Sequence, residues 1–182
     1  MSQTDELTKV SGYVEHIVYR NQENGYTVME LSTGESLLTL VGSLFYINEG
    51  EYVDAEGRLT EHPLYGEQLK VVNINVSHPK DLESIERYLA SGAVKGIGPG
   101  LAGRIVLKFK EDTFRILEEE PERLSEVKGI SDKMAARIAE ATVGQRERRQ
   151  AVVFLQDLGI GINLAMKIYE NYYIKRGLNT LW

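Results

Sequence analysis

The stretch KGIGPGLAGRI at residues 95–105 is the first of three copies of one short pattern in the second half of the chain. The pattern returns as KGISDKMAARI at 128–138 and as LGIGINLAMKI at 158–168. The copies lie 33 and 30 residues apart, and the Gly-Ile pair, the alanine and the basic residue near the end keep their register. A fixed period of this kind indicates one supersecondary unit that is used repeatedly. The sequence therefore predicts three similar helical units.

Each copy has the residue types of a tight hairpin between two helices. In the first copy, Gly96 and Gly98 let the backbone turn tightly and approach a ligand closely, because glycine has no Cβ. Pro99 suits the first turn of the following helix. The N–H groups of that turn have no partner inside the helix, and the helix dipole favours an anion beside them. The pattern therefore predicts a phosphate-binding device for a nucleic-acid backbone rather than the site of a small-molecule enzyme.

The predicted DNA contacts are the hairpin loops and the basic residues beside them. Lys95 lies on the first hairpin, and Arg104 follows about one turn into the next helix, within expected reach of a second phosphate. We rank the first copy as the strongest contact and the second copy next, and we interpret the third as structural because Leu158 replaces the lysine. The set contains no catalytic residue and no metal ligand. Its members are Lys95, Gly96, Ile97, Gly98, Gly100, Arg104, Lys128, Gly129, Ser131, Lys133, Arg137, Gly159, Gly161 and Lys167.

A structural interpretation of these glycines stands beside the functional one. A single Gly-x-Gly is more often a helix C-cap in a plain helical bundle than a ligand site. Three aligned copies, all with a base at the position of Arg104, favour DNA binding. The alternative is a protein-interaction module whose hairpins only hold the fold together.

The first half of the chain is predicted to be all-β. Alternating apolar residues and glycine-marked turns predict five short strands at residues 10–19, 26–31, 36–42, 51–59 and 68–76. Five strands in about 70 residues suit a small Greek-key barrel of the OB type, and a sandwich is the open alternative. The period becomes helical after residue 80, which predicts helices at 81–90, 99–109, 112–119, 121–126, 132–142, 146–157 and 162–173.

The predicted fold class is therefore α+β with segregated domains. An OB-like β-barrel domain spans residues 1–78, a tandem helix-hairpin-helix DNA-binding domain spans 79–173, and 174–182 form an unassigned tail. Charge divides unevenly between the halves of the chain. Residues 1–80 hold 12 acidic and five basic residues, whereas residues 81–182 hold 15 acidic and 16 basic residues. We therefore expect a local basic footprint at the hairpins, and a protein that contacts the acidic barrel is a further possible partner.

Composition excludes several other classes of protein. The chain has no cysteine, so it can form neither a disulfide framework nor a thiolate metal site. Its three histidines are far apart and lack metal-ligand spacing, and no zinc site is expected. The first ten residues lack the apolar segment of a signal peptide, and no apolar run reaches the roughly 18 residues that a membrane helix needs. We expect no membrane association.

The repeats look like helix-hairpin-helix motifs, which in known families bind the DNA backbone non-specifically. More narrowly, the stretch from Gly12 to about Tyr173 resembles the N-terminal region of bacterial helicases of the RecD/TraA type. The ordering and spacing of the matches extend through nearly the full chain. The matching stretches are VEHI at 14–17, NGYTV at 24–28, HPLYGEQ at 62–68, YLASG at 88–92, KGIGP at 95–99, FLQ at 154–156 and GI at 159–160.

The resemblance implies an ATP-dependent DNA helicase of superfamily 1 that moves 5′ to 3′ on single strands in the bacterial cytoplasm, with roles in repair and recombination. ATP and Mg would be cofactors of the whole helicase, and its partners would be single-stranded or forked DNA and its own motor domains. Some members of the family hold a monovalent cation at such hairpins, and the sequence leaves that open.

The motor of such a helicase needs G-x-x-x-x-G-K-[ST] to hold ATP phosphates, and this chain has no Gly-Lys-Ser or Gly-Lys-Thr. We therefore expect a piece of a longer helicase that does not itself hydrolyse ATP. RuvA-like junction-binding scaffolds also join an OB barrel to paired hairpins and assemble as tetramers. Three hairpins instead of two, together with the match at residues 62–68, favour the helicase.

Overall fold

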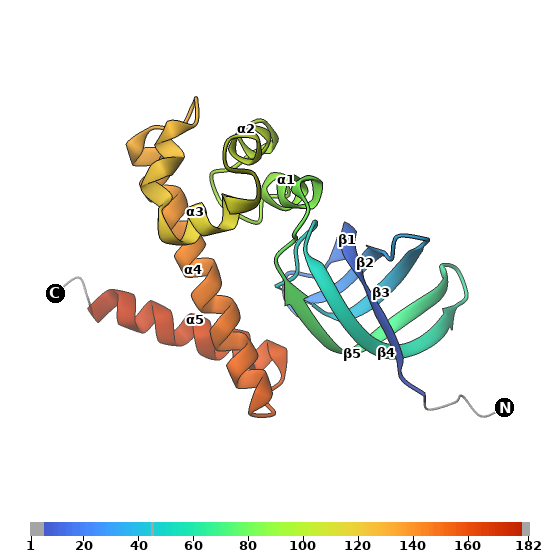
Figure 1. The fold of residues 1–182 in the computed structure, drawn as a ribbon. Helices are drawn as coiled ribbons and strands as arrows, with labels where there is room; N and C mark the ends of the chain where they lie inside the picture. Colours follow the sequence, from blue (N-terminus) through green and yellow to red (C-terminus); the bar gives the residue numbers. More distant parts are fainter. Residues whose placement is uncertain (1–5, 45, 180–182) are drawn as a thin grey trace.

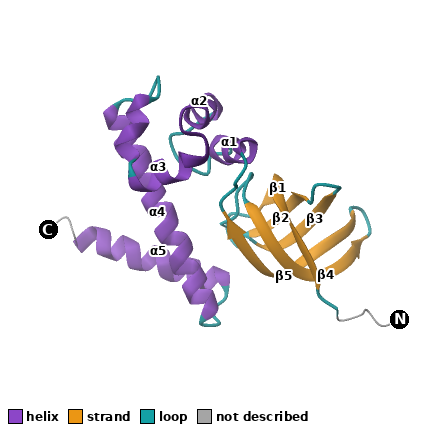
Figure 2. Ribbon diagram, in the orientation of Figure 1, coloured by secondary structure: helices purple, strands orange, loops and turns teal. Residues whose placement is uncertain are grey.

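A β-barrel is followed by an array of helices in the computed structural model, which describes residues 6–44 and 46–179 (Figure 1). The barrel strands are β1 (Thr8–Arg20), β2 (Tyr26–Ser32), β3 (Leu37–Ser43), β4 (Tyr52–His62) and β5 (Gly66–Ser77). The α-helices are α1 (Leu82–Ala90), α2 (Pro99–Phe109), α3 (Thr113–Glu119), α4 (Asp132–Asp157) and α5 (Ile162–Asn179). A short 3-10 helix, η1 (Lys110–Asp112), connects α2 to α3, and a second, η2 (Pro121–Glu126), connects α3 to α4. Strands and helices are segregated along the chain, as Figure 2 shows, and the predicted fold class is confirmed.

The five strands close into a barrel in the order β1-β2-β3-β5-β4. All neighbouring pairs are antiparallel except β3 and β5, which run parallel. Alternate residues point inward, and Val14, Met29, Leu40, Val53 and Leu69 are completely buried. Closure through the β3–β5 pair selects the OB-type barrel over the sandwich.

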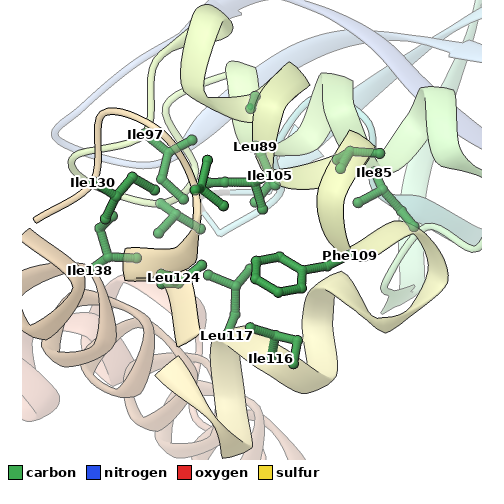
Figure 3. Close-up of a cluster of buried hydrophobic side chains, with 14 of the residues drawn as sticks. Ile85, Leu89, Ile97, Ile105, Phe109, Ile116, Leu117, Leu124, Ile130 and Ile138 are labelled. Carbon is green, nitrogen blue, oxygen red and sulfur yellow. The ribbon is translucent and has the colours of Figure 1, made fainter. Parts of the chain in front are cut away.

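The helical core is built from the first two repeats and the segment between them. Figure 3 shows isoleucine, leucine and phenylalanine side chains from α1, α2, α3, η2 and the start of α4 meeting in one cluster. Ile85, Leu89, Ile105, Leu124 and Ile138 are buried there. Burying a side chain of this size stabilises the fold by roughly 1.5–3 kcal/mol, so the two repeats hold each other in place.

The last two helices differ from the prediction. Residues 132–157 form one continuous helix of 26 residues, whereas the sequence predicted a break between 142 and 146. The intervening segment contains Gly144, and a single glycine costs a helix only about 1 kcal/mol relative to alanine. The second difference is at the end of the chain, where α5 continues to Asn179. Residues 174–179 of the unassigned tail are therefore helical, and 180–182 lie outside the described residues.

Candidate nucleic-acid interface

The first two hairpins have the same backbone geometry. Gly96 and Gly129 both lie in the left-handed region, with φ of 97° and 96°, where a side chain is strained. The N–H of Ile97 donates to the carbonyl of Val94 at 3.2 Å, and the N–H of Ile130 donates to that of Val127 at 3.1 Å. The 33-residue offset in the sequence is therefore a structural repeat.

The apolar residues of these two hairpins point into one shared core. Figure 3 shows Ile97 and Ile105 of the first hairpin lying across from Ile130 and Ile138 of the second. Because the valines and isoleucines are used for packing, the loop backbone and the lysines stay at the surface. Four equivalent pairs are buried in this way: Val94 and Val127, Ile97 and Ile130, Ala102 and Ala135, Ile105 and Ile138.

The helices that follow the two hairpins begin differently. Gly98 is the N-cap of α2 and provides no side-chain hydrogen bond, and a Cβ added there would meet no atom within 4 Å. The first-turn N–H groups at Gly100 and Leu101 are therefore left without a side-chain cap on an exposed loop. In α4, by contrast, the Ser131 hydroxyl accepts from the N–H of Met134 at 3.2 Å. Because Pro99 has no N–H, each helix has two first-turn N–H groups without a side-chain cap, at Gly100 and Leu101 in α2 and at Asp132 and Lys133 in α4.

Most of the predicted basic residues are exposed, and Arg104 has a protein partner. Lys95, Lys128, Lys133 and Arg137 lie at the surface around the paired hairpins. The Arg104 guanidinium donates through Nε to the carbonyl of Gly100 at 3.1 Å and through Nη1 to that of Lys128. A Cβ on Gly129 would lie 2.7 Å from that Nη1. Arg104 therefore joins the two hairpin loops, which the sequence did not predict.

The third hairpin has a different geometry. Gly159 is left-handed with φ 83°, but the N–H of Ile160 donates to Leu155, five residues back, at 3.0 Å. This is a Schellman-type helix end. Asp157 stands where the other hairpins have Val94 and Val127, so the residue that closes their loops is missing.

The third hairpin is also separated from the other two by the length of α4. Its buried residues are Val152, Ala165 and Met166, which form a small separate core that Tyr46 of the barrel side packs against. The 26 residues of α4 span on the order of 40 Å. Gly159, Gly161 and Lys167 therefore do not join the interface formed by the first two hairpins.

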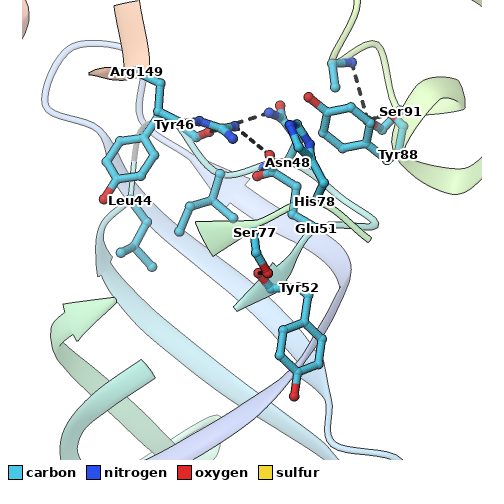
Figure 4. Close-up of polar contacts among 12 residues, drawn as sticks. Leu44, Tyr46, Asn48, Glu51, Tyr52, Ser77, His78, Tyr88, Ser91 and Arg149 are labelled. Carbon is cyan, nitrogen blue, oxygen red and sulfur yellow. Dashed lines mark hydrogen bonds and ion pairs between the residues drawn. The ribbon is translucent and has the colours of Figure 1, made fainter. Parts of the chain in front are cut away.

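An ion pair between the two domains was not predicted from the sequence. Figure 4 shows Arg149 of α4 reaching Glu51, which is completely buried just before β4. Arg149 Nη2 lies 2.5 Å from Glu51 Oε1 and also donates to the carbonyl of Tyr46 at 3.2 Å. The other carboxylate oxygen accepts from the N–H of Asn48 at 2.8 Å. Arg149 is the last residue of the charged run RERR at 146–149, and the structure uses it as a contact between the helices and the barrel.

Burial around this ion pair shifts the pKa of the neighbouring groups. Burial raises the pKa of the Glu51 carboxyl, and the Arg149 guanidinium and the Asn48 N–H oppose the shift. Burial, with the nearby Glu51 carboxylate, also raises the pKa of Tyr88 to about 12. The charges at this junction therefore depend on each other because they are shielded from water.

Two further contacts hold α1 against the barrel. Arg87 Nη1 lies 2.7 Å from Glu15 Oε2 of β1. Gly50 packs directly on the α1 backbone with φ 84°, and a Cβ there would lie 2.5 Å from the N of Tyr88. No side chain fits between these two segments, so the barrel and the hairpins meet at a close backbone contact.

Within the described residues, no cluster of three or more His, Asp or Glu is arranged to hold a metal ion. The same residues include no helix with the length and hydrophobicity needed to cross a membrane.

Comparison with known proteins agrees with this geometry. The family model for the OB-fold domain of the ATP-dependent DNA helicase YrrC matches residues 7–79. The family model for the SAM-like helix-hairpin-helix tandem matches residues 86–142. The second match contains the first two hairpins and ends within α4, before the third. The chain thus joins a barrel that is similar to the OB-fold domain of that helicase to a helical segment that is similar to a helix-hairpin-helix tandem.

A particular relative supports the same class. The ATP-dependent RecD2 DNA helicase of Deinococcus radiodurans is 31% identical in an alignment of 175 residues that covers 92% of this chain. The chain spans only 24% of the length of that relative. The resemblance to the N-terminal region of RecD/TraA-type helicases is confirmed by these matches.

Proposed function

We propose that this chain is the DNA-binding region of a RecD-like helicase and holds the DNA backbone non-specifically through its first two hairpins. The observation that carries the proposal is the equivalence of those hairpins, each with a left-handed glycine, a buried Val–Ile pair and an exposed lysine at the loop. Backbone N–H groups at a helix start, together with lysines, bind phosphate oxygens and do not read bases.

The roles of the predicted residues divide accordingly. Lys95 and Lys128 supply charge at the loops, and Lys133 and Arg137 extend the basic surface along α4. Arg104 acts mainly by holding the two loops together, because its guanidinium is bonded to the Lys128 carbonyl. The third hairpin has a structural role.

The activity of the whole protein is part of the same proposal. Motor domains of the parent chain would bind ATP and Mg and move 5′ to 3′ on single strands as a superfamily 1 helicase in the bacterial cytoplasm, acting in repair and recombination. The similarity to RecD2 supports this. In this arrangement the hairpins grip the strand while the barrel packs on the rest of the enzyme or on another protein.

Replacing both loop lysines is expected to weaken DNA binding and its dependence on salt. Each phosphate contact contributes about 0.7–0.9 to the slope of log K against log salt, so Lys95→Gln with Lys128→Gln should reduce the slope by about 1.5. The measurement is fluorescence anisotropy with labelled single-stranded, forked, duplex and four-way-junction DNA at several salt concentrations. Lys70→Gln, on the exposed surface of β5, is the matched control.

Each alternative function predicts a different outcome of this experiment. An unchanged affinity and slope in the double variant would mean that the hairpins are structural and that the domain binds protein. A strong preference for the four-way junction would favour the junction scaffold.

A further inference from the structure

A cleft lies where the end of the barrel meets the helices. Its volume is about 280 Å³, just below the range of roughly 300–1,000 Å³ that is typical of sites for drug-sized molecules, so it suits a smaller group. Four apolar or aromatic side chains line it: Val76 of β5, Tyr88 of α1, and Phe114 and Leu117 of α3. We refer to this hollow as the domain cleft.

The polar side of the domain cleft comes from α4. Gln145, Arg146 and Gln150 line it, and none of the three has a hydrogen-bond or ion-pair partner among the residues that the structure describes. Gln145 lies seven residues, about two turns, from both Ile138 and Val152, which are buried on the same side of the helix. Packing alone would call for an apolar residue between them. These polar groups are therefore left over by the fold and can bind a ligand.

The aromatic side of the domain cleft is held in place by contacts between rings. His78 stacks on Phe114 with ring centroids 4.2 Å apart, and Tyr88 meets both rings edge-on. Figure 4 shows His78 and Tyr88 close to Arg149. An ordered cluster of this kind offers a further flat ring a surface on which to pack.

The charges around the domain cleft favour a neutral ligand over a phosphate. Arg149 is paired with the Glu51 carboxylate, and Glu118 lines the cleft together with Arg146. Burial and the nearby Arg149 lower the pKa of His78, although the Glu118 carboxylate opposes them, so the imidazole is neutral at pH 7. The carboxylates thus balance the guanidinium groups. A flat, neutral ring with donors and acceptors on its edge, such as a nucleobase, fits both sides of the cleft.

The domain cleft is continuous with the first hairpin. The carbonyl of Val94 accepts from the N–H of Ile97 and closes the hairpin loop, and Val94 also lines the cleft. Lys95, the next residue, lies at the surface. A strand whose phosphate is held at this loop therefore passes near the cleft.

We propose that the domain cleft takes one unstacked base of the single strand whose backbone the first two hairpins hold. This inference rests on the proposed function and adds a contact to a base where that function has contacts to phosphates only. The base packs on the aromatic cluster, and its edge meets Gln145, Arg146 and Gln150. Because stacking accepts every base and a glutamine amide can donate or accept, the contact does not depend on sequence.

Abasic DNA tests this inference, because it keeps every phosphate and lacks the bases. The affinity of the 182-residue chain for a mixed-sequence single strand and for an abasic strand of equal length is measured by fluorescence anisotropy at one salt concentration. We expect the abasic strand to bind about tenfold more weakly, which is within the range for one stacked base. In Gln145→Ala with Gln150→Ala this ratio should fall to about twofold, because two hydrogen bonds to the base edge are lost. Gln22→Ala, at an exposed turn of the barrel, is the control and should keep the ratio.

Photocrosslinking locates the base independently of these variants. Single strands that carry 5-iododeoxyuridine at one position are irradiated with the chain, and mass spectrometry identifies the modified peptides. We expect crosslinks at the peptides of His78, Tyr88 or Phe114, and Ser77→Trp, which fills the domain cleft from the end of β5, should abolish them. Crosslinks confined to other peptides, or an unchanged ratio in the glutamine double variant, would overturn the inference.

The lysine variants distinguish failure of this inference from failure of the proposed function. Replacing Lys95 and Lys128 should weaken binding to ordinary and abasic strands by the same factor, since only phosphate contacts are lost. That result, combined with an unchanged ratio in the glutamine double variant, would reject the inference alone. An unchanged affinity in the lysine variant would reject the proposed function, and the absence of any DNA binding would reject both.

Discussion

Arg149→Ala is expected to lower the free energy of unfolding by about 3–5 kcal/mol, because it leaves the carboxylate of Glu51 buried without its partner. Glu51 is completely buried, and the Arg149 guanidinium lies 2.5 Å from it. The remaining Asn48 N–H provides only one hydrogen bond to a charge that water cannot reach. Urea denaturation followed by far-ultraviolet circular dichroism measures the loss.

The neighbouring arginine provides the matched control for this substitution. Arg148 lies next to Arg149 on α4 and pairs with Glu170 at 3.7 Å on the surface, where such a pair contributes at most about 1 kcal/mol. Adding Glu51→Gln to Arg149→Ala should recover part of the loss, since it removes the unpaired charge. Equal losses for Arg148→Ala and Arg149→Ala would contradict the assigned role of the buried pair.

Gly50→Ala is expected to destabilise the contact between the barrel and α1 by about 3 kcal/mol. The residue has φ 84°, a conformation that is strained for alanine by about 1 kcal/mol. The new Cβ would also lie 2.5 Å from the N of Tyr88 and 2.8 Å from the carbonyl of Ser84. Both are backbone atoms of a packed helix, so relief requires the two domains to separate, at a further cost of about 1–3 kcal/mol.

Gly34→Ala separates the two causes of this effect. Gly34 has a similar φ of 92°, but no atom lies within 4 Å of the position of its Cβ. The free energy of unfolding of Gly34→Ala should therefore fall by only about 1 kcal/mol, which is the contribution from backbone strain. Denaturation gives the difference between the two variants, and a larger radius of gyration for Gly50→Ala by X-ray scattering would show domain separation. If both variants lose the same amount, the close contact between Gly50 and α1 is unimportant.

Local sequence patterns predicted the barrel and the paired hairpins because those elements depend on neighbouring residues. Alternation marks the strands, and the Val–Gly–Ile spacing of each hairpin fixes both its turn and its buried side chains. The break predicted between 142 and 146 in α4 was wrong, because tertiary packing and helix continuity outweigh one glycine.

Other features required the tertiary structure. Arg149 and Glu51 are 98 residues apart, and nothing near either residue signals that they meet. Arg104 looked like a phosphate contact because the position is basic in every copy, yet the left-handed loop at Gly129 places a carbonyl within its reach. The different geometry of the third hairpin did have a signal in the sequence, since Asp157 replaces the valine of the other two copies.

The length of α4 fixes how the parts of the molecule that it connects are rotated relative to each other about the helix axis. Arg149 lies 18 residues beyond Ser131, which is about five complete turns. The side of the helix that starts at the second hairpin is therefore the side that locks onto the barrel. Because α4 is one continuous helix, a rotation of α5 would be transmitted to the barrel and to the first two hairpins together. These parts would then move as one rigid body and not independently of each other.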